Sequence, residues 1–401
     1  MAFVFNPVAM DALPGFSREG FAMLRWWILL AGVLWPSWVL AQRPPVVVPP
    51  RAETILERLP KGYAALVPGR ALATASDRLA QVERLLTTSA RTGDARLATR
   101  AQALLARFPA ADTSPAVLRA RAYTAQHRHD FDAAVGLLDT LIQNQPRNAD
   151  ARLSRAQILL VQGHLDRARR DCTVLALGVD SGRGLLCVAA LSLRTGDTEA
   201  AARLADRWLD HAGARDESRR YALVMRAEIA SRAEAGRADV EHAEVWFKRA
   251  LALAPNDVRT LAAYARHLRG QGRHAQVLQL LAAAPDTDGL HLERTLAAHA
   301  IGDPAARAMI GAQARRYRLM RAVGNEPELR DEAEFALMLQ ADPDRALVLA
   351  QRNFASQRDA EDVDLLRRAA AAAQRPQALQ PVQAWADAQR LELPRRPGNG
   401  S

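Results

Sequence analysis

The chain has 401 residues, of which 49% are hydrophobic and only 5% aromatic, and its formal net charge is +10. This length predicts two or three domains or one long repeat array, and the apolar content excludes a chain that is disordered throughout. The residues that favour strands are too sparse for a β-sandwich or barrel, so the Ala-, Leu- and Arg-rich composition predicts closely packed helices.

The positive charge is distributed along the whole chain. Only two of the 54 cationic residues are lysines, Lys61 and Lys248. A basic balance permits a nucleic-acid, anionic-lipid or acidic-protein partner. The arginines stand beside Asp or Glu, however, and no block of five or more like charges occurs. We therefore expect no nucleic-acid partner.

Residues 1–41 have the parts of a secretory signal. Arg25 precedes an apolar stretch that ends at Pro36, and small residues lead to a candidate cleavage site between Ala41 and Gln42. The apolar span is shorter than the roughly 20 residues of a transmembrane helix. We expect an exported, periplasmic protein. The alternative is an uncleaved inner-membrane anchor that leaves the chain facing the periplasm, and only this segment would then touch a membrane.

Residues 1–22 fit poorly before such a signal, because they are long and carry both Asp11 and Glu19. One hypothesis is that translation begins at Met23 and that 1–22 are not translated. Residues 42–60 follow as a Pro-rich linker, in which 43–50 predict a polyproline II spacer.

A repeat of about 34 residues fills much of the remaining chain. Small residues recur at intervals of 34 and 33 residues in two series, Ala122, Ala156 and Ala189, and then Ala134, Ala168 and Ala201. A turn residue lies between the two alanines of each unit. The equivalent positions along the chain hold Gly93, His129, Gly163, Gly196, Gly272 and Gly302.

This pattern predicts pairs of helices of about 14 residues that stack on one another, because a single hairpin cannot cover its own apolar face. A turn glycine adopts a left-handed conformation at low cost. The alanines stand where helices cross closely. The pattern resembles the tetratricopeptide repeat, most clearly over 115–284 and weakly over 76–391. The resemblance implies an all-α superhelical solenoid of antiparallel hairpins.

We expect this helical array to cover 61–316, with a break near 317–328. Two further hairpins at 329–391 continue it, which gives about nine in all, and residues 392–401 form a disordered tail. The helices expected in the last two hairpins are 331–340, 345–354, 359–374 and 377–391.

The two cysteines, Cys172 and Cys187, lie at equal distances on either side of the turn at 178–182. Antiparallel neighbouring helices would hold them at the same height, within disulfide range if both face inward. An oxidising compartment favours a bond. The alternative is two buried free thiols.

No motif predicts catalysis. The chain lacks a Gly-rich phosphate loop and the Gly-x-Ser-x-Gly and His-Glu-x-x-His motifs. His127 and His129 have no second cluster of ligand residues at metal-binding spacing. We therefore expect no enzyme, no metal site and no cofactor.

The resemblance implies a concave groove lined by the first helix of each hairpin, which takes an extended or helical peptide of another protein. The candidate groove residues are Arg119, Tyr123, Gln126, Gln157, Arg183, Arg194, Tyr221, Glu228, Arg266 and Arg269. This set is net positive and would suit an acidic partner or a terminal carboxylate. Two alternatives are ordinary solvated side chains and a groove filled by the chain's own ends.

The function predicted on this basis is a non-enzymatic protein-interaction scaffold of the bacterial envelope. A second hypothesis is an assembly subunit of an envelope biogenesis or secretion complex that docks through its edges. A third is an accessory factor anchored in the inner membrane.

Overall fold

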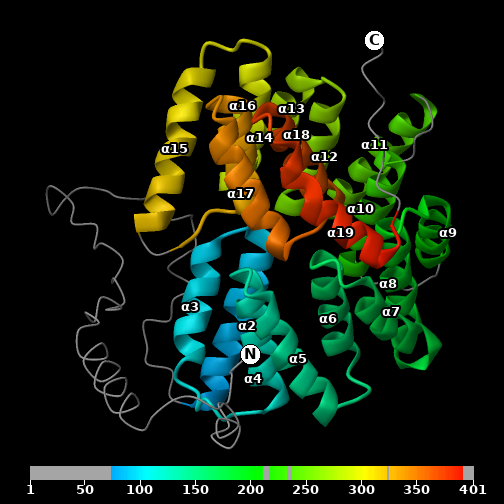
Figure 1. Cartoon of the computed structure of the whole chain (residues 1–401). Coiled ribbons are helices and arrows are strands. Elements are labelled where there is room, and N and C mark those ends of the chain that lie inside the picture. Colours follow the sequence, from blue (N-terminus) through cyan, green and yellow to red (C-terminus); the bar gives the residue numbers. More distant parts are fainter. Residues whose placement is uncertain (1–73, 211–215, 233–236, 323–324, 392–401) are drawn as a thin grey trace, which may run out of the picture. The chain divides into compact units, whose positions relative to one another are not determined.

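Helices follow one another along the chain in the computed structural model (Figure 1), which describes residues 74–210, 216–232, 237–322 and 325–391. Eighteen α-helices and no strands occur in these described ranges. The α-helices are α2 (Ala75–Thr92), α3 (Ala95–Leu105), α4 (Pro115–His127), α5 (Phe131–Asn144), α6 (Ala149–Val161), α7 (Leu165–Val174), α8 (Ser181–Arg194), α9 (Thr198–Leu209), α10 (Asp216–Arg232), α11 (Arg237–Leu253), α12 (Val258–Gly270), α13 (His274–Leu281), α14 (Asp288–Ala300), α15 (Ala306–Ala322), α16 (Leu329–Leu339), α17 (Pro343–Ser356), α18 (Ala360–Ala372) and α19 (Gln380–Gln389). A π-helical turn η3 (Leu175–Val179) follows α7, and a 3₁₀ turn η4 (Pro376–Leu379) precedes α19.

Most helices pair in chain order into hairpins, beginning with α2 and α3 and including α16 with α17, and neighbouring hairpins pack on one another. All six predicted turn positions have positive φ angles, namely Gly93, His129, Gly163, Gly196, Gly272 and Gly302. An Asp side chain caps the helix that follows several of these turns, as Asp130 does for α5 and Asp197 for α9. The predicted repeat is thereby confirmed at its turns.

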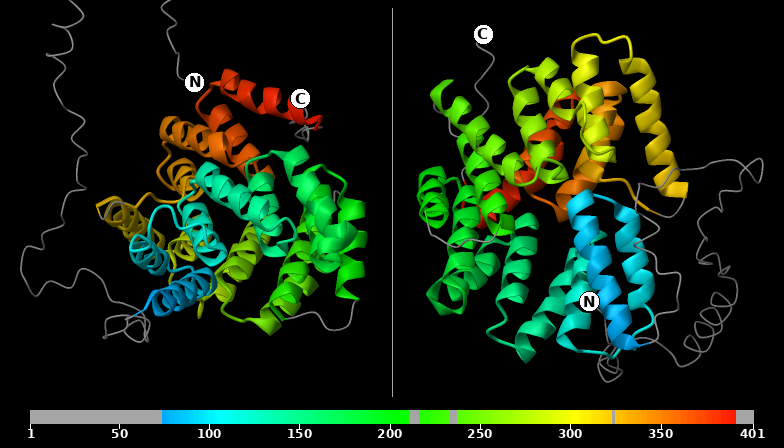
Figure 2. Two further views of the ribbon diagram at one scale, coloured as in Figure 1. Left: turned by 90° about the horizontal axis from the view of Figure 1, so that it is seen from below. Right: turned by 180° about the vertical axis from the view of Figure 1, so that it is seen from behind.

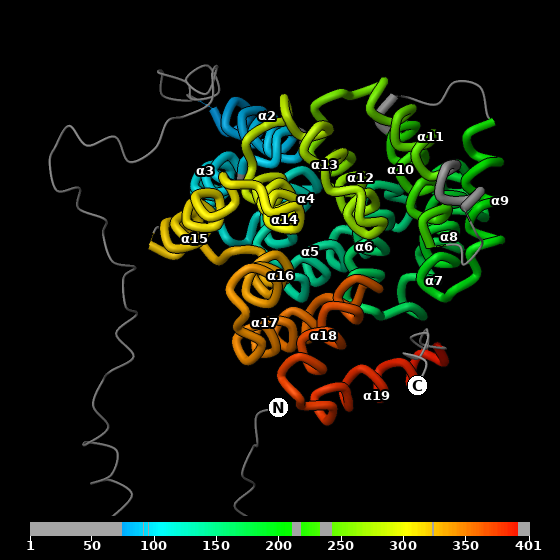
Figure 3. Tube along the Cα trace, turned by 90° about the horizontal axis from the view of Figure 1, so that it is seen from above, coloured from blue at the N-terminus to red at the C-terminus, as the bar shows by residue number. Residues whose placement is uncertain are grey.

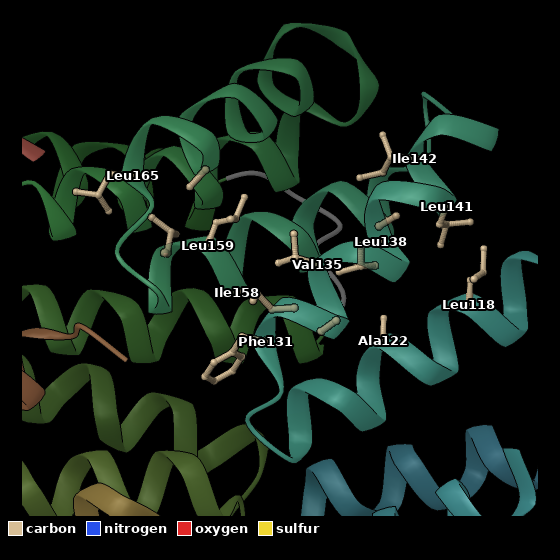
Figure 4. Close-up of a cluster of buried hydrophobic side chains, with 14 of the residues drawn as sticks. Leu118, Ala122, Phe131, Val135, Leu138, Leu141, Ile142, Ile158, Leu159 and Leu165 are labelled. Atoms are coloured by element: carbon tan, nitrogen blue, oxygen red, sulfur yellow. The ribbon is translucent and has the colours of Figure 1, made fainter. Parts of the chain in front are cut away.

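The recurring alanines are buried where helices cross. Ala134, Ala156, Ala168, Ala189 and Ala201 are all 0% exposed. Leucines and isoleucines fill the space between hairpins, and Figure 4 shows one such cluster, in which Leu138 and Leu141 of α5 lie with Ile158 and Leu159 of α6. Burying such side chains contributes about 1.5–3 kcal/mol each. The core therefore continues from hairpin to hairpin, as expected for a solenoid.

The last hairpins begin close to the predicted positions, but the predicted end of the array at residue 316 falls inside α15. That helix continues through Tyr317, which is 3% exposed and packs edge-on against Phe335 of α16 with ring centroids 5.5 Å apart. Apart from Ala322 at the end of α15, every described residue belongs to one unit made of 49–321 and 325–401. Figure 2 and Figure 3 show this unit from three further sides.

Cys172 and Cys187 form a disulfide between α7 and α8, with Cα atoms 5.2 Å apart. They lie in a small buried cluster with Ala156 and Leu175. The turn between the two helices is tight, because a Cβ added to Gly184 would lie 2.3 Å from the backbone of Ala176. The equal spacing of the cysteines from this turn puts them at the same height.

The predicted signal, its cleavage site at Ala41 and Gln42, the linker and the tail lie outside the described residues. Within the described residues, no helix has both the length and the apolar character needed to span a bilayer.

Candidate functional site

The ten candidate groove residues lie on the first helices of five successive hairpins: α4, α6, α8, α10 and α12. We call the side of these helices that carries them the first-helix face. Its members have two kinds of partner. Some contact the neighbouring hairpin, and others contact helices α16–α19, which we call the C-terminal helices.

The N-terminal members of the first-helix face join one hairpin to the next. Arg119 Nη2 lies 2.7 Å from Glu83 Oε1 of α2, and Arg183 Nη1 lies 2.8 Å from Asp150 Oδ1 of α6. The Tyr123 hydroxyl donates to the Leu86 carbonyl over 3.4 Å. Gln126 is half-buried near the end of α4. These partly exposed contacts contribute little to stability, and they leave this end of the face accessible.

The later members contact acidic residues of the C-terminal helices. Arg194 of α8 pairs with Asp359, the residue that caps α18. Arg269 of α12 places Nε 2.9 Å from Glu293 Oε2 of α14 and Nη1 3.0 Å from Glu334 Oε1 of α16. Burial opposes the charge of Arg269, but the two glutamates outweigh it and raise the pKa of the guanidinium. Arg194 and Arg269 are thus each paired with carboxylates of the same chain.

Tyr221 and Glu228 of α10 lie near the start of α18. Tyr221 is 41% exposed and is in hydrogen-bond contact with Gln157 of α6. Burial and then Glu361 of α18 raise the pKa of Glu228, against the nearby arginines. Arg266 of α12 lowers the pKa values of Glu228 and Glu361 alike. Glu361 Oε1 lies 3.6 Å from Arg232 Nη2, so the start of α18 lies beside α10.

A second set of contacts joins the C-terminal helices to the turn between α6 and α7. Trp385 Nε1 of α19 donates to the Gly163 carbonyl over 3.1 Å, and a Cβ added to Gly163 would lie 2.6 Å from that nitrogen. The Arg358 backbone amide donates to the Val161 carbonyl over 2.7 Å. The Leu165 amide donates to Gln389 Oε1 over 3.2 Å. Figure 1 shows α19 beside these helices.

A third contact ties the start of α16 to the turn between α4 and α5. His129 Nε2 lies 2.8 Å from Glu328 Oε2, and Gln357 donates to Glu328 over 3.1 Å. Burial would raise the pKa of Glu328, but His129 and Arg330 lower it to about 2. Burial would lower the pKa of His129, but Glu328 raises it. The pair is therefore ionised in mildly acidic solution.

These contacts lie along the later part of the predicted groove. Arg194 and Arg269 meet the start of α18 and α16 of the same chain, which favours the alternative of a groove filled by the chain's own ends, whereas Tyr221 between them is 41% exposed. The physical reason is charge: Asp359, Glu361 and Glu334 are the acidic ligand that the arginines were expected to bind.

The sequence analysis missed the residues of the C-terminal helices that make these contacts. Two signals were available. Asp359, Glu361 and Asp362 form an acidic cluster at a helix start, and Trp385 is an isolated aromatic residue in an aromatic-poor region. Neither signal identifies its partner, because the contacts join residues about 200 positions apart.

The chemistry available to these side chains is ion pairing and hydrogen bonding. No group of three or more His, Cys, Asp or Glu in the described ranges is placed to hold a metal ion. Asp331 of α16 is a strongly perturbed acid, because burial and then Glu328 raise its pKa to about 7. This shift accompanies crowding between carboxylates on the inner side of the helices.

No protein-family model and no curated protein matches the sequence. Solved structures do resemble the fold. The human IFIT1 dimer with PPP-AAAA has a TM-score of 0.50 at 12% identity, over 79% of this chain and 72% of that one. Cut9 in the APC/C hetero-tetramer Cut9–Hcn1 has a TM-score of 0.49 at 14% identity, over 80% and 62%.

A tetratricopeptide repeat protein from Parabacteroides merdae is similar over 64% of this chain and 99% of its own, with 19% identity and a TM-score of 0.39. At these identities the likenesses concern the fold. The likeness to IFIT1, together with the repeat period, the left-handed turns and the buried alanines, defines the class: the chain is an all-α solenoid of tetratricopeptide-like hairpins.

Proposed function

We propose that this protein is a non-enzymatic protein-interaction scaffold of the bacterial envelope, exported through its first 41 residues. Its partners dock on the outer surfaces of the hairpins, as the assembly-subunit hypothesis requires. One observation carries the second part: Asp359 and Glu334 of the C-terminal segment pair with Arg194 and Arg269 of the first-helix face. An acidic peptide would have to compete with these carboxylates for the two arginines.

The contacts around Gly163 help to keep the C-terminal helices against the earlier hairpins. Displacing α19 would break the Trp385 and Gln389 hydrogen bonds together, and displacing α18 would leave Arg194 and Arg330 without their carboxylates. Leaving buried charges without partners costs several kcal/mol. A partner that binds an accessible outer surface meets no such cost.

Site-specific photocrosslinking in cells tests this proposal. A photoreactive residue replaces the half-buried Glu228 on the first-helix face in one strain, Arg318 of α15 in a second and Arg169 of α7 in a third. We expect adducts with other proteins from at least one outer position and none from Glu228. Adducts from Glu228 alone would show that partners enter the groove, and no adduct from any position would contradict a scaffold role.

Export is tested separately by cell fractionation and sequencing of the mature N-terminus. We expect a periplasmic protein that begins at Gln42. A membrane-bound protein that keeps residues 24–41 would support the anchored form instead, and a protein retained in the cytoplasm would contradict the envelope assignment.

A further inference from the structure

The outer face of α15 differs from the rest of the array in its charge. The helix contains five arginines and no Asp or Glu in its 17 residues. Two of the arginines are neutralised by neighbouring segments: Arg316 Nη2 lies 2.6 Å from Asp286 Oδ2, and Arg321 pairs with Glu332. The other three are Arg307, Arg315 and Arg318.

These three arginines share one exposed stripe. All are exposed, and none makes an ion pair or side-chain hydrogen bond with another residue of the described ranges. Spacings of eight and three residues put them on the same side of a helix, along about 16 Å of its length. The stripe therefore presents three unpaired guanidinium groups in a row.

The surface between the arginines is formed by residues with small side chains. Ala308, Gly311 and Ala312 occupy the neighbouring positions, and a Cβ added to Gly311 would meet only Arg315 Nη1, at 3.6 Å. Leu319 is 47% exposed at the edge of the stripe. Small residues allow a second helix to approach closely. Figure 1 and Figure 2 show α15 at the edge of the described unit, with its outer side free of other described helices.

The opposite side of α15 explains why the outer side is available. Tyr317 and the half-buried Ile310 pack against Leu292 and Leu296 of α14 and Phe335 of α16. His291 of α14 and Gln313 lie in hydrogen-bond contact, 2.7 Å apart. The inner side of the helix thus makes the packing contacts, and its basic side is turned away from them.

We propose that the outer face of α15 is a docking surface for an acidic helix of a partner protein. This inference rests on the proposed scaffold function and deepens it. Carboxylates at helical spacing would form charge-assisted, bidentate hydrogen bonds with the three guanidinium groups, while the small residues let the two helices approach. The proposal commits to a protein helix because Leu319 is the only large apolar side chain exposed on α15, and a helix that inserts into a membrane surface needs a broad apolar face.

The test uses the purified full chain and a fluorescent, alanine-based helical peptide that carries a stripe of glutamates. A peptide with Gln in place of Glu is the neutral control. Anisotropy titrations compare the wild type with R307E/R315E/R318E. The matched control is R169E/R170E/R352E, which makes the same change in charge at exposed arginines of α7 and α17. Circular dichroism confirms that all variants are folded.

We expect the acidic peptide to bind the wild type and the control variant equally, more weakly as salt is raised. The α15 variant should bind at least about tenfold more weakly. Equal binding by the α15 variant, or equal binding of the neutral peptide, would overturn the inference. So would binding of anionic vesicles or of an oligonucleotide through these arginines without binding of the peptide. Photocrosslinks from Arg169 alone would then leave the scaffold function standing without a role for α15.

Discussion

At the scale of single residues, Gly163 joins the turn between α6 and α7 to the last helix, α19. Its left-handed φ of 74° belongs to the repeat, whereas its lack of a side chain also makes room for Trp385, 222 residues further on. Gly196 is the left-handed glycine at the equivalent turn of the next hairpin, with a φ of 86°, but no atom lies within 4 Å of a Cβ added there. A substitution at Gly196 therefore measures the backbone strain alone, and one at Gly163 measures the strain together with the steric contact with Trp385.

Gly163→Ala should destabilise the protein more than Gly196→Ala. Both pay the cost of a left-handed alanine, about 1–3 kcal/mol, but only the first meets the indole. Urea unfolding of each variant, alone and combined with Trp385→Ala, measures the difference. We expect the excess cost at Gly163 to disappear when Trp385 is absent. An equal cost at both positions would mean that Trp385 does not pack on this turn.

The disulfide is a second feature at this scale. Its residues are 15 positions apart, and closing a loop of this size stabilises a protein by about 3 kcal/mol in the chain-entropy model. We expect C172A/C187A to lose about that amount in urea unfolding, and the wild type to become less stable on reduction. Mass spectrometry of the non-reduced protein should find no free thiol. Two free thiols in protein taken from the periplasm would contradict the bond.

Asp331 should make stability depend on pH. Burial and Glu328 raise its pKa to about 7, so the folded protein holds a proton there that the unfolded chain releases near pH 4. Its contribution is therefore fully present at low pH and is lost as pH rises towards 7 and above. The raised pKa of His129 acts in the same direction above about pH 6.5.

Asp331→Asn should accordingly be more stable than the wild type at pH 8, and by a clearly smaller margin at pH 5. Urea unfolding at the two pH values measures this, with Asp166→Asn, an exposed carboxylate of α7, as the matched control. If Asp331→Asn changed stability by the same amount at both pH values, the carboxyl would not be in the crowded acidic environment described above.

At the scale of helices, the contact of α12 with α14 and α16 depends on one cation between two anions. Arg269 is shared by Glu293 and Glu334, and all three side chains are largely buried. Removing the cation leaves Glu293 without its ion-pair partner and Glu334 with Arg368 alone, whereas removing one anion leaves the other in place. Removing the cation should therefore destabilise the protein more than removing one anion.

Arg269→Met should cost about 3–5 kcal/mol, which is the usual cost of breaking a buried pair, and Glu334→Gln should cost clearly less. The triple variant R269M/E293Q/E334Q should recover much of the loss, because no charge is then left unpaired. Thermal and urea unfolding of the three variants test this order. A loss for Glu334→Gln as large as that for Arg269→Met would show that the cation is not shared.

How far the sequence predicts these helices depends on where their partners lie. The hairpins, turn glycines and buried alanines could be predicted because a turn and a helix crossing are set by residues within about 34 positions of each other, as at Gly163 and Ala156. The predicted break at 317–328 contains the connection between α15 and α16, but Tyr317 still belongs to α15, and the aromatic residue that packs on it, Phe335, belongs to a later hairpin.

The candidate site was predicted only in part for the same reason. The resemblance selected Arg194 and Arg269 because they stand on first helices, but their acidic partners Asp359 and Glu334 lie 165 and 65 positions away. Local patterns carry no information about such pairs. The three arginines of α15 were not selected at all, because the resemblance assigns binding to first helices and α15 is a second helix.

At the scale of the whole described unit, the account depends on the C-terminal helices lying against the earlier hairpins. Contacts at several places hold them there, among them His129 with Glu328, Arg194 with Asp359, and the turn at Gly163 with Trp385. The first two are ionic, and salt weakens most strongly the first, which is the more exposed. The third combines aromatic packing with hydrogen bonds to backbone groups, and we expect it to persist at high salt.

Amide hydrogen exchange of the α6–α7 turn tests this central claim most directly. The Leu165 amide donates to Gln389, and Trp385 covers Gly163, so peptides that span 161–165 should exchange slowly in the wild type. In W385A/Q389A we predict exchange at least about tenfold faster there, with the α8–α9 turn at Gly196 unchanged. Equally fast exchange of this segment in both proteins would contradict the account, because it would mean that the C-terminal helices do not rest on the array in solution.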